Sequence, residues 1–197
     1  MKKSILSIVL LAGALMFGSC TTEQRNAAQA EAQEEIQELK EEIEELRSAL
    51  GQKEKNIENM DLDFTDHGPD FFSVDIEDYT DANTNFRTTL WTGHQMQLTL
   101  MSIPVGGDIG EEIHGEIEQF IRIESGEGEV FIGETQETMK SVKRVGDDDI
   151  VFIPRGVWHN IKNIGDEPIK LYSIYAPTEH PKGTIHVTME EGQEHDH

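Results

Sequence analysis

Short apolar stretches, separated by glycine and proline turns, run through the second half of the chain. The clearest one, at 97–103, alternates polar and apolar residues over its first four positions. Similar stretches follow at 119–124, 130–132, 141–145, 149–153, 158–164 and 169–175, with turn-forming residues between them. A less regular stretch at 71–76 could form a leading strand, and 77–85 is expected to be loop or a short helical turn. Regularly spaced short strands predict a mostly β domain, built as an antiparallel sandwich or barrel.

A different periodicity marks 27–60, which is rich in Ala, Glu, Gln, Lys and Leu and contains no proline. Apolar residues recur there in alternating steps of three and four, interrupted at Lys53: Ile36, Leu39, Ile43, Leu46, Leu50, Ile57 and Met60. This heptad predicts a parallel two-stranded coiled coil. The alternative is a lone helix solvated by its charges. In either case the segment is a stalk, on the order of 50 Å long at 1.5 Å per residue.

The first twenty residues have the features of a targeting segment. Lys2 and Lys3 precede an apolar run at 5–17, and small residues then lead to Cys20. The run is shorter than the ~20 residues needed to span a membrane, and it fits a secretory signal. The Gly-Ser-Cys ending resembles a bacterial lipoprotein box, which implies cleavage before Cys20 and a lipid on its sulfur. The alternative is an ordinary signal peptide with an incidental cysteine. The resemblance places the protein outside the cytoplasm, anchored to a membrane of the bacterial cell envelope.

These patterns divide the chain into six expected segments. They are a signal peptide (1–19), a tether (20–26), the coiled-coil helix (27–60), a linker (61–70), the β-barrel domain (71–187) and an acidic disordered tail (188–197). The formal net charge of −23 repels phosphate backbones, which argues against nucleic-acid partners. The single cysteine excludes an internal disulfide framework.

Polar residues capable of binding a metal fall on the inward face of the predicted strands. Residues two apart on a strand share a face, so Glu112 and His114 project together. Gln119 shares the face of two isoleucines that must enter the core, whereas Glu118 points outward. By the same parity His159 faces inward. Burying so many polar groups without partners costs several kcal/mol, and one bound cation would satisfy all of them. None of these inward positions carries Arg or Lys.

At these residues the chain resembles the cupin family, a superfamily of small β-barrels or jelly rolls. Its first motif corresponds here to Gly106, Glu112, His114, Gln119 and Gly126, and its second to Pro154, Gly156, His159 and Asn163. Asp148 stands where the leading glycine of the second motif would be. The resemblance, which covers about 86–177, implies a single-domain cupin.

By the same resemblance, the family's metal positions fall on Glu112, His114, Gln119 and His159. The family has histidine where this chain has Glu112, and glutamate where it has Gln119. Two imidazoles, a carboxylate and an amide oxygen suit a divalent Fe, Mn, Ni or Zn ion without choosing among them. The alternative is a metal-free cupin whose polar cluster is hydrogen-bonded or binds a small ligand directly.

The resemblance also extends, over 148–175, to a subgroup labelled mannose-6-phosphate-isomerase-like. We do not expect a phosphosugar substrate, because such a site needs inward Arg or Lys. Further residues that could line a pocket are Gln97, Met101, Tyr175 and His186. No catalytic residue is assigned, although Glu112 could serve either as a ligand or as a general base.

Three classes of function are compatible with this sequence. The first is a metal-dependent enzyme, either an oxygenase or an isomerase/lyase, acting on a small molecule. The second is a module that binds a small molecule or carbohydrate without turnover. The third is a structural envelope protein in which the stalk is the working part. A homo-oligomer, formed through the coiled coil or the barrel or both, is expected in each case.

Overall fold

The computed structural model of the chain describes residues 22–58 and 61–195. The chain divides after Glu58 into two compact units. The signal segment, the lipidation site Cys20 and the seam residue Met60 lie outside the described residues, so these predictions stay predictions.

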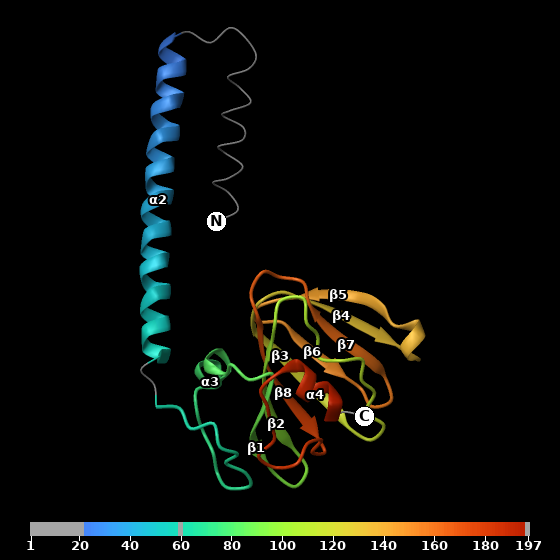
Figure 1. Cartoon of the computed structure of the whole chain (residues 1–197). Coiled ribbons are helices and arrows are strands. Elements are labelled where there is room, and N and C mark those ends of the chain that lie inside the picture. Colours follow the sequence, from blue (N-terminus) through green and yellow to red (C-terminus); the bar gives the residue numbers. More distant parts are fainter. Residues whose placement is uncertain (1–21, 59–60, 196–197) are drawn as a thin grey trace. The chain divides into compact units, whose positions relative to one another are not determined.

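The first unit contains one long helix, α2 (Thr22–Glu58), shown in blue in Figure 1. Its seam residues are turned to solvent: Ile36, Ile43, Leu46 and Leu50 are 45%, 49%, 61% and 59% exposed. A single copy of the helix therefore leaves its apolar stripe uncovered, and pairing of two helices stays a prediction. Within the described parts of the chain, every helix is too short or too polar to cross a membrane.

The second unit consists of two antiparallel sheets (Figure 1). The larger sheet has the order β6-β3-β8-β2-β1-β9, and the smaller has the order β5-β4-β7. The strands of the larger sheet are β1 (Arg87–Thr92), β2 (Gln97–Ile103), β3 (Glu118–Ser125), β6 (Ile150–Ile153), β8 (Ile169–Ala176) and β9 (Ile185–His186). Those of the smaller are β4 (Gly128–Gly133), β5 (Lys140–Val145) and β7 (Trp158–Asn163), and a short 3₁₀ helix, η1 (Gln136–Thr138), joins β4 to β5. The predicted mostly β jelly roll with antiparallel sheets is confirmed.

The main core lies between the sheets and follows the predicted alternation of strand residues. On β3, Gln119, Ile121 and Ile123 are buried, whereas Glu118 is exposed. On β7, His159 and Ile161 are both 0% exposed. The inward parity inferred from the sequence is thus confirmed, and it determines which polar side chains enter the barrel.

A second core cluster covers the outer face of the larger sheet. It is formed by Leu90 and Leu100 of the sheet, by Tyr79 of helix α3 (Ile76–Ala82), and by Leu62 and Phe64 from the preceding segment. Within the segment 61–70, predicted as a linker, the apolar side chains of Leu62 and Phe64 thus pack against the sheet. The expected leading strand at 71–76 is wrong, because Asp75 caps the start of α3 by accepting a hydrogen bond from Glu77 N.

The predicted disordered tail contains a short helix, α4 (Met189–His195). Thr188 and Glu191 form a reciprocal cap, in which Thr188 Oγ1 accepts from Glu191 N and Glu191 Oε2 accepts from Val187 N and Thr188 N. Gly192 packs closely against the Phe86 ring, where a Cβ atom would lie 2.3 Å from a ring carbon. The cap and this close packing explain why 189–195 is ordered despite its acidic composition.

Each histidine-bearing motif begins at a residue with left-handed backbone geometry. Gly106 has φ 74°, and Asp148, which replaces the glycine of the second motif, has φ 66°. Asp148 is the one non-glycine residue with positive φ in the described part of the chain. Aspartate tolerates this conformation better than most residues, and its carboxylate pairs with Arg122. The geometry of the motif is therefore kept although its glycine is not.

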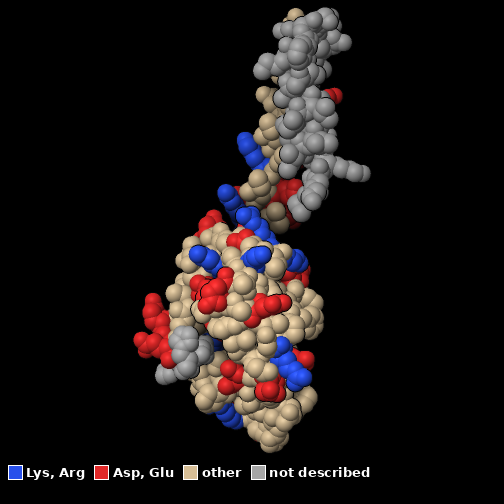
Figure 2. Space-filling model, turned by 90° about the vertical axis from the view of Figure 1, so that its right-hand side faces the viewer, with Lys and Arg blue, Asp and Glu red and all other residues tan. Residues whose placement is uncertain are grey.

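The surface of the barrel carries both signs of charge. Figure 2 shows Lys and Arg side chains interspersed with Asp and Glu side chains over the face in view. On this face the two signs of charge are therefore mixed.

Candidate metal centre

The loop between β2 and β3 runs alongside β7 and carries two of the predicted ligands. Glu112 N donates to His159 O over 3.0 Å, and His159 N donates to Glu112 O over 2.9 Å. The carbonyl of His114 accepts from Gly156 N over 2.7 Å. These backbone contacts bring residues from both motifs to one end of the barrel interior.

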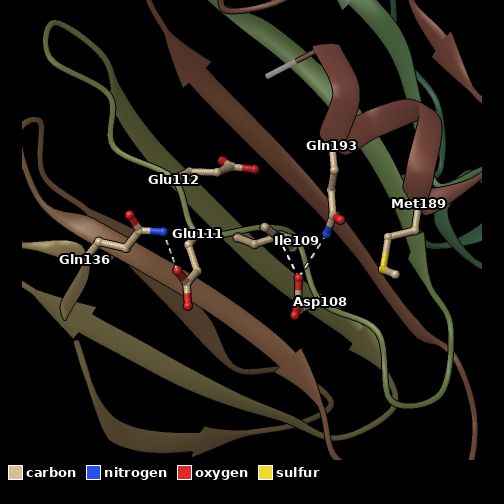
Figure 3. A pocket seen from close by; sticks show the side chains of 8 residues that line it. Asp108, Ile109, Glu111, Glu112, Gln136, Met189 and Gln193 are labelled. Carbon is tan, nitrogen blue, oxygen red and sulfur yellow. Dashed lines mark hydrogen bonds between the residues drawn. The ribbon is translucent and has the colours of Figure 1, made fainter. Parts of the chain in front are cut away.

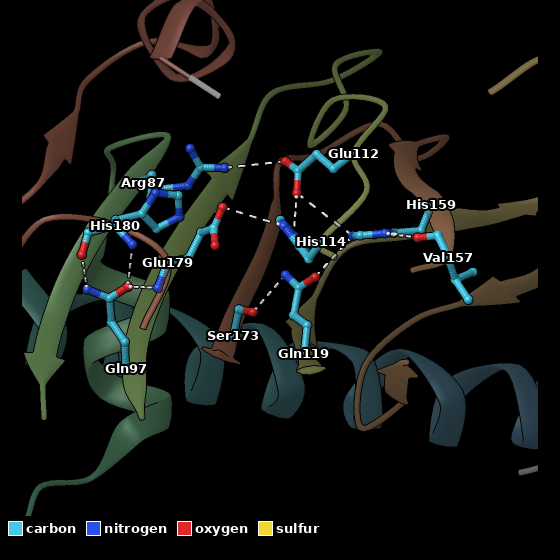
Figure 4. A network of polar contacts seen from close by, with 10 residues as sticks. All are labelled: Arg87, Gln97, Glu112, His114, Gln119, Val157, His159, Ser173, Glu179 and His180. Atoms are coloured by element: carbon cyan, nitrogen blue, oxygen red, sulfur yellow. Dashed lines mark hydrogen bonds and ion pairs between the residues drawn. The ribbon is translucent and has the colours of Figure 1, made fainter. Parts of the chain in front are cut away.

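Three side chains meet at this end. Glu112 Oε2 lies 3.2 Å from His114 Nε2 and 3.8 Å from His159 Nε2. The candidate ligand atoms of the three residues all lie within 4.8 Å of one another. The side chains of Glu112, His114 and His159 are 9%, 10% and 0% exposed, so little bulk water competes for their lone pairs. Figure 4 shows these side chains pointing toward one another.

Gln119 joins the cluster from β3, with its amide oxygen toward the triad. Gln119 Nε2 donates to Ser173 Oγ over 3.0 Å, and Ser173 Oγ in turn donates to Phe120 O over 3.2 Å. This chain of donors turns Gln119 Oε1 toward His159 Nε2, which lies 3.0 Å away. All four predicted metal positions are thus brought together in space.

The tautomer of His159 follows from its other ring nitrogen. His159 Nδ1 lies 3.0 Å from Val157 O, and because a carbonyl only accepts, Nδ1 carries the proton. Burial lowers the pKa of His159 and outweighs the opposing charge of Glu112, so the ring is neutral. Its Nε2 therefore offers a lone pair to the centre, 3.0 Å from Gln119 Oε1.

His114 has the opposite protonation behaviour. Burial lowers its pKa, but hydrogen bonds and charge interactions with Glu112 and Glu179 outweigh burial and raise the pKa to about 9. Nε2 of His114 is buried and lies 3.2 Å from Glu112 Oε2. Without a metal, a proton on His114 thus provides a positive charge beside Glu112.

The donor set therefore fits a divalent cation. Two Nε2 atoms, one carboxylate oxygen and one amide oxygen converge. When both imidazole rings are neutral, none of these four atoms donates a hydrogen bond. Mixed N and O ligands with two imidazoles suit Fe, Mn, Ni or Zn. A bound ion would be held by Glu112, His114, Gln119 and His159, and it would supply Lewis-acid or oxygen-activating chemistry.

Arg87 adds a buried cation to the residues identified from the sequence. It lies on β1 with 1% of its surface exposed, and its Nη2 is 3.5 Å from Glu112 Oε1. The guanidinium also lies 5.6 Å from the centre of the Phe86 ring. The inward positions identified from the sequence carry no Arg or Lys, and Arg87 was not among them because β1 was not recognised as a strand.

The segment after β8 crosses the same end of the barrel. Glu179 Oε1 lies 3.5 Å from His114 Nδ1, on the side of the ring away from the triad. The His180 ring packs edge-on against Tyr175, with 5.2 Å between ring centres. Burial and the nearby Arg87 charge lower the pKa of His180 to about 3, so this ring is neutral.

The four predicted pocket residues have different locations. Tyr175 lies beside the triad, with its ring 5.8 Å from that of His114. Gln97 is buried and holds the backbone at 179–180. Met101 belongs to the main aliphatic core, and His186 lies on β9 opposite Arg87. Tyr175 thus contacts a ligand side chain directly, while Gln97 supports the segment that carries Glu179.

A pocket of about 350 Å³ adjoins the centre on the Glu112 side. Its walls come from the loop after β2, from Gln136 and from α4: Asp108, Ile109, Gly110, Glu111, Glu112, Gln136, Met189 and Gln193. Figure 3 shows Gln136 donating to Glu111 and Gln193 donating to Asp108 across this space. Glu112 belongs to both the pocket and the triad, so a small molecule in the pocket would lie next to this one ligand residue.

Sequence reasoning missed several residues of the centre: Arg87, Ser173 and Glu179. The signal for Ser173 was present, because it alternates with Leu171 and Tyr175 on β8 and all three are buried. Arg87 could have been found once 87–92 was recognised as a strand. Glu179 follows the last long strand in an irregular segment, where periodicity carries no information about direction.

Comparison with known proteins gives a match to one protein family and to two relatives. A model of the cupin domain family matches residues 99–175. The uncharacterized protein YrkC of Bacillus subtilis is 48% identical over 131 residues, covering 66% of this chain and 70% of that protein. The uncharacterized protein L612 of Acanthamoeba polyphaga mimivirus is 38% identical over 117 residues, covering 59% of this chain and 71% of that protein.

A solved structure supports the same assignment. The crystal structure of a Bacillus halodurans protein is 53% identical, covers 64% of this chain and 96% of its own, and superposes with a TM-score of 0.64. The matched residues 99–175 include all four residues of the candidate metal cluster: Glu112, His114, Gln119 and His159. The chain therefore belongs to the cupin superfamily.

Proposed function

We propose that the protein is a metal-dependent cupin of the bacterial cell envelope that binds and acts on a small molecule. The single observation that carries the metal site is the convergence of Glu112, His114 and His159, whose candidate ligand atoms all lie within 4.8 Å of one another. Gln119 Oε1, 3.0 Å from His159 Nε2, would complete the ligand set of a bound cation. The neighbouring pocket of about 350 Å³ provides room for a ligand beside it.

Metal analysis of the purified protein tests this proposal most directly. The wild type is expected to hold about one equivalent of Fe, Mn, Ni or Zn. The His114→Ala/His159→Ala double variant is expected to hold none, whereas His94→Ala, which changes an exposed histidine, keeps the wild-type content. Wild-type protein that takes up no divalent metal, even when metal is added, would contradict the proposal.

Substrate screening then separates an enzyme from a binding module. In an enzyme, metal-loaded wild type turns over a small molecule and the double variant does not. Binding without turnover would support the alternative of a non-catalytic module. The sugar-phosphate substrate suggested by the subgroup resemblance is not part of the proposal. The buried Arg87 already pairs with Glu112, its Nη2 lying 3.5 Å from Glu112 Oε1.

The envelope location rests on the sequence of 1–20 and on the apolar seam of α2. We propose that lipid on Cys20 anchors the chain to a membrane and that paired α2 helices hold the barrels at a distance from it. Cys20→Ala is expected to release the protein into the soluble fraction of the envelope. Leu46→Lys, which places a charge on a seam position that is 61% exposed in the single chain, is expected to shift the oligomer toward monomer in sedimentation measurements.

A further inference from the structure

The two ligand histidines are held through Nδ1 by different partners. His159 donates to a backbone carbonyl, whereas His114 faces the carboxylate of Glu179, which belongs to neither cupin motif. We propose that Glu179 is the positioning residue for His114 as a metal ligand, and that Gln97 holds Glu179 in place for this role.

The position of Glu179 excludes it as a ligand of the same ion. Its Oε1 lies 3.5 Å from His114 Nδ1, while the triad lies at Nε2 on the other side of the ring, 3.2 Å from Glu112 Oε2. A carboxylate at Nδ1 keeps the proton there and leaves the Nε2 lone pair for the metal. It also orients the ring and makes Nε2 a stronger electron-pair donor.

Gln97 connects the segment 179–180 to the barrel wall. Its Oε1 accepts from Glu179 N over 3.3 Å and from His180 N over 2.9 Å, and its Nε2 donates to His180 O over 2.8 Å. The side chain of Gln97 is 0% exposed, and it lies on β2 opposite Tyr175 of β8. Both ends of one buried amide therefore hold the backbone on either side of the Glu179–His180 peptide bond (Figure 4).

A second anchor holds the far end of this segment. Asp66 Oδ2 accepts from Gly183 N over 3.1 Å and from Thr92 Oγ1 over 2.5 Å, and Lys182 donates to Gly68 O. The segment is thus attached at two points, although it has no regular secondary structure. Glu179 itself is 29% exposed, so its place beside His114 depends on these backbone anchors rather than on tight packing of its side chain.

This inference rests on the proposed function, because it assigns a role toward the metal. Its test is the metal affinity of the purified full-length protein, measured by competition with a chelator. Glu179→Gln, which keeps the size but removes the charge, is expected to weaken metal binding about tenfold, and Glu179→Ala by ~10–100-fold. Glu118→Gln removes the same charge from the exposed side of β3 and is expected to leave the affinity unchanged.

The absorption spectrum of the Co(II)-loaded protein gives a readout that a merely structural role would not move. Rotation of the His114 ring changes the ligand field, so the Co(II) bands are expected to shift in Glu179→Gln and not in Glu118→Gln. The metal-free melting temperature checks that each variant is folded. If Glu179→Gln lowers this melting temperature but leaves the Co(II) spectrum and the affinity of the folded protein unchanged, the positioning role is overturned.

The role of Gln97 is tested by a double-mutant cycle. Gln97→Glu keeps the acceptor for both N–H groups and loses the donor to His180 O. We expect it to weaken metal binding in the wild-type background and to have no further effect in the Glu179→Gln background, because Gln97 acts through Glu179. Additive losses would overturn the link between the two residues. Failure of the wild type to bind metal contradicts the proposed function instead, so the two failures are distinguishable.

Discussion

His114 and His159 face the same carboxylate with the same ring nitrogen, yet their proton affinities are shifted in opposite directions. His159 lies on a strand, is 0% exposed and gives its Nδ1 proton to a neutral carbonyl. His114 lies on a loop, is 10% exposed and is placed between Glu112 and Glu179. Burial lowers the pKa of His159, while the two carboxylates raise that of His114 to about 9.

The difference teaches that a motif locates a ligand but does not determine its charge. Both histidines were identified from the spacing of their motifs. The pKa of His159 is lowered by burial, whereas that of His114 is raised by two carboxylates, Glu112 two residues away and Glu179 65 positions along the chain. Metal binding must therefore displace a proton at His114 and none at His159.

The largest expected effect is loss of either histidine. His114→Ala and His159→Ala should each weaken metal binding by more than the ~10–100-fold typical of partners outside the ligand set, because each removes a ligand atom. The two variants should differ without metal. His159→Ala opens a cavity in the barrel interior and lowers the melting temperature more, since this residue is completely buried. Equal melting temperatures for the two variants would contradict the expectation that His159 on the strand contributes more to stability than His114 on the loop.

An intermediate effect is expected from Gln119→Glu, which supplies the glutamate that the cupin motif has at this position. The new carboxylate faces His159 Nε2 and adds a negative charge to the ligand set. Metal affinity is expected to rise about tenfold, while the metal-free protein loses stability because a third anion joins Glu112 and Glu179. Calorimetric titration with metal and a thermal melt in chelator measure the two effects. A fall in affinity would show that Gln119 is not a ligand.

The pH dependence of the stability of the metal-free protein tests the protonation of His114. Its folded pKa of about 9 lies above the ordinary value of 6.5, so the protonated form stabilises the metal-free fold. This stabilisation is fully present below about pH 6.5 and is lost as the pH rises through about 9. Metal affinity is expected to increase over the same window, because deprotonation then costs less. Thermal melts in chelator provide the measurement, and His114→Gln should flatten this part of the profile.

The smallest expected effect concerns the turn before β6. Asp148→Ala should destabilise the protein by about 1 kcal/mol relative to Asp148→Gly, because φ of 66° disfavours a Cβ atom. Both variants lose the ion pair with Arg122, so the comparison isolates backbone geometry. Chemical denaturation measures it, and metal affinity should be equal in the two variants. If Asp148→Ala were as stable as Asp148→Gly, the backbone of this turn would have moved away from its positive φ.

Much of the barrel was predictable because its strands have one face in the core. Alternation alone placed Gln119 inward and Glu118 outward, and the structure confirms both. The same rule could not reach Glu179, which lies in an irregular segment held by the side chain of Gln97. The ordered C-terminal helix was missed because composition was weighed above the local cap formed by Thr188 and Glu191. Periodicity thus identifies which residues of a regular strand face inward, whereas tertiary hydrogen bonds determine the positions of residues in irregular segments.

Because part of the pocket wall comes from the C-terminal helix α4, the shape of the pocket and the affinity for metal can change independently. Met189 and Gln193 form part of the pocket wall, while the metal ligands come from the loop after β2 and from β3 and β7. Substitutions on α4 can therefore alter the size and polarity of the space offered to a ligand without touching the metal-binding residues. Relatives with the same barrel could diverge in ligand preference through a few residues of this helix, each change testable against an unchanged metal affinity.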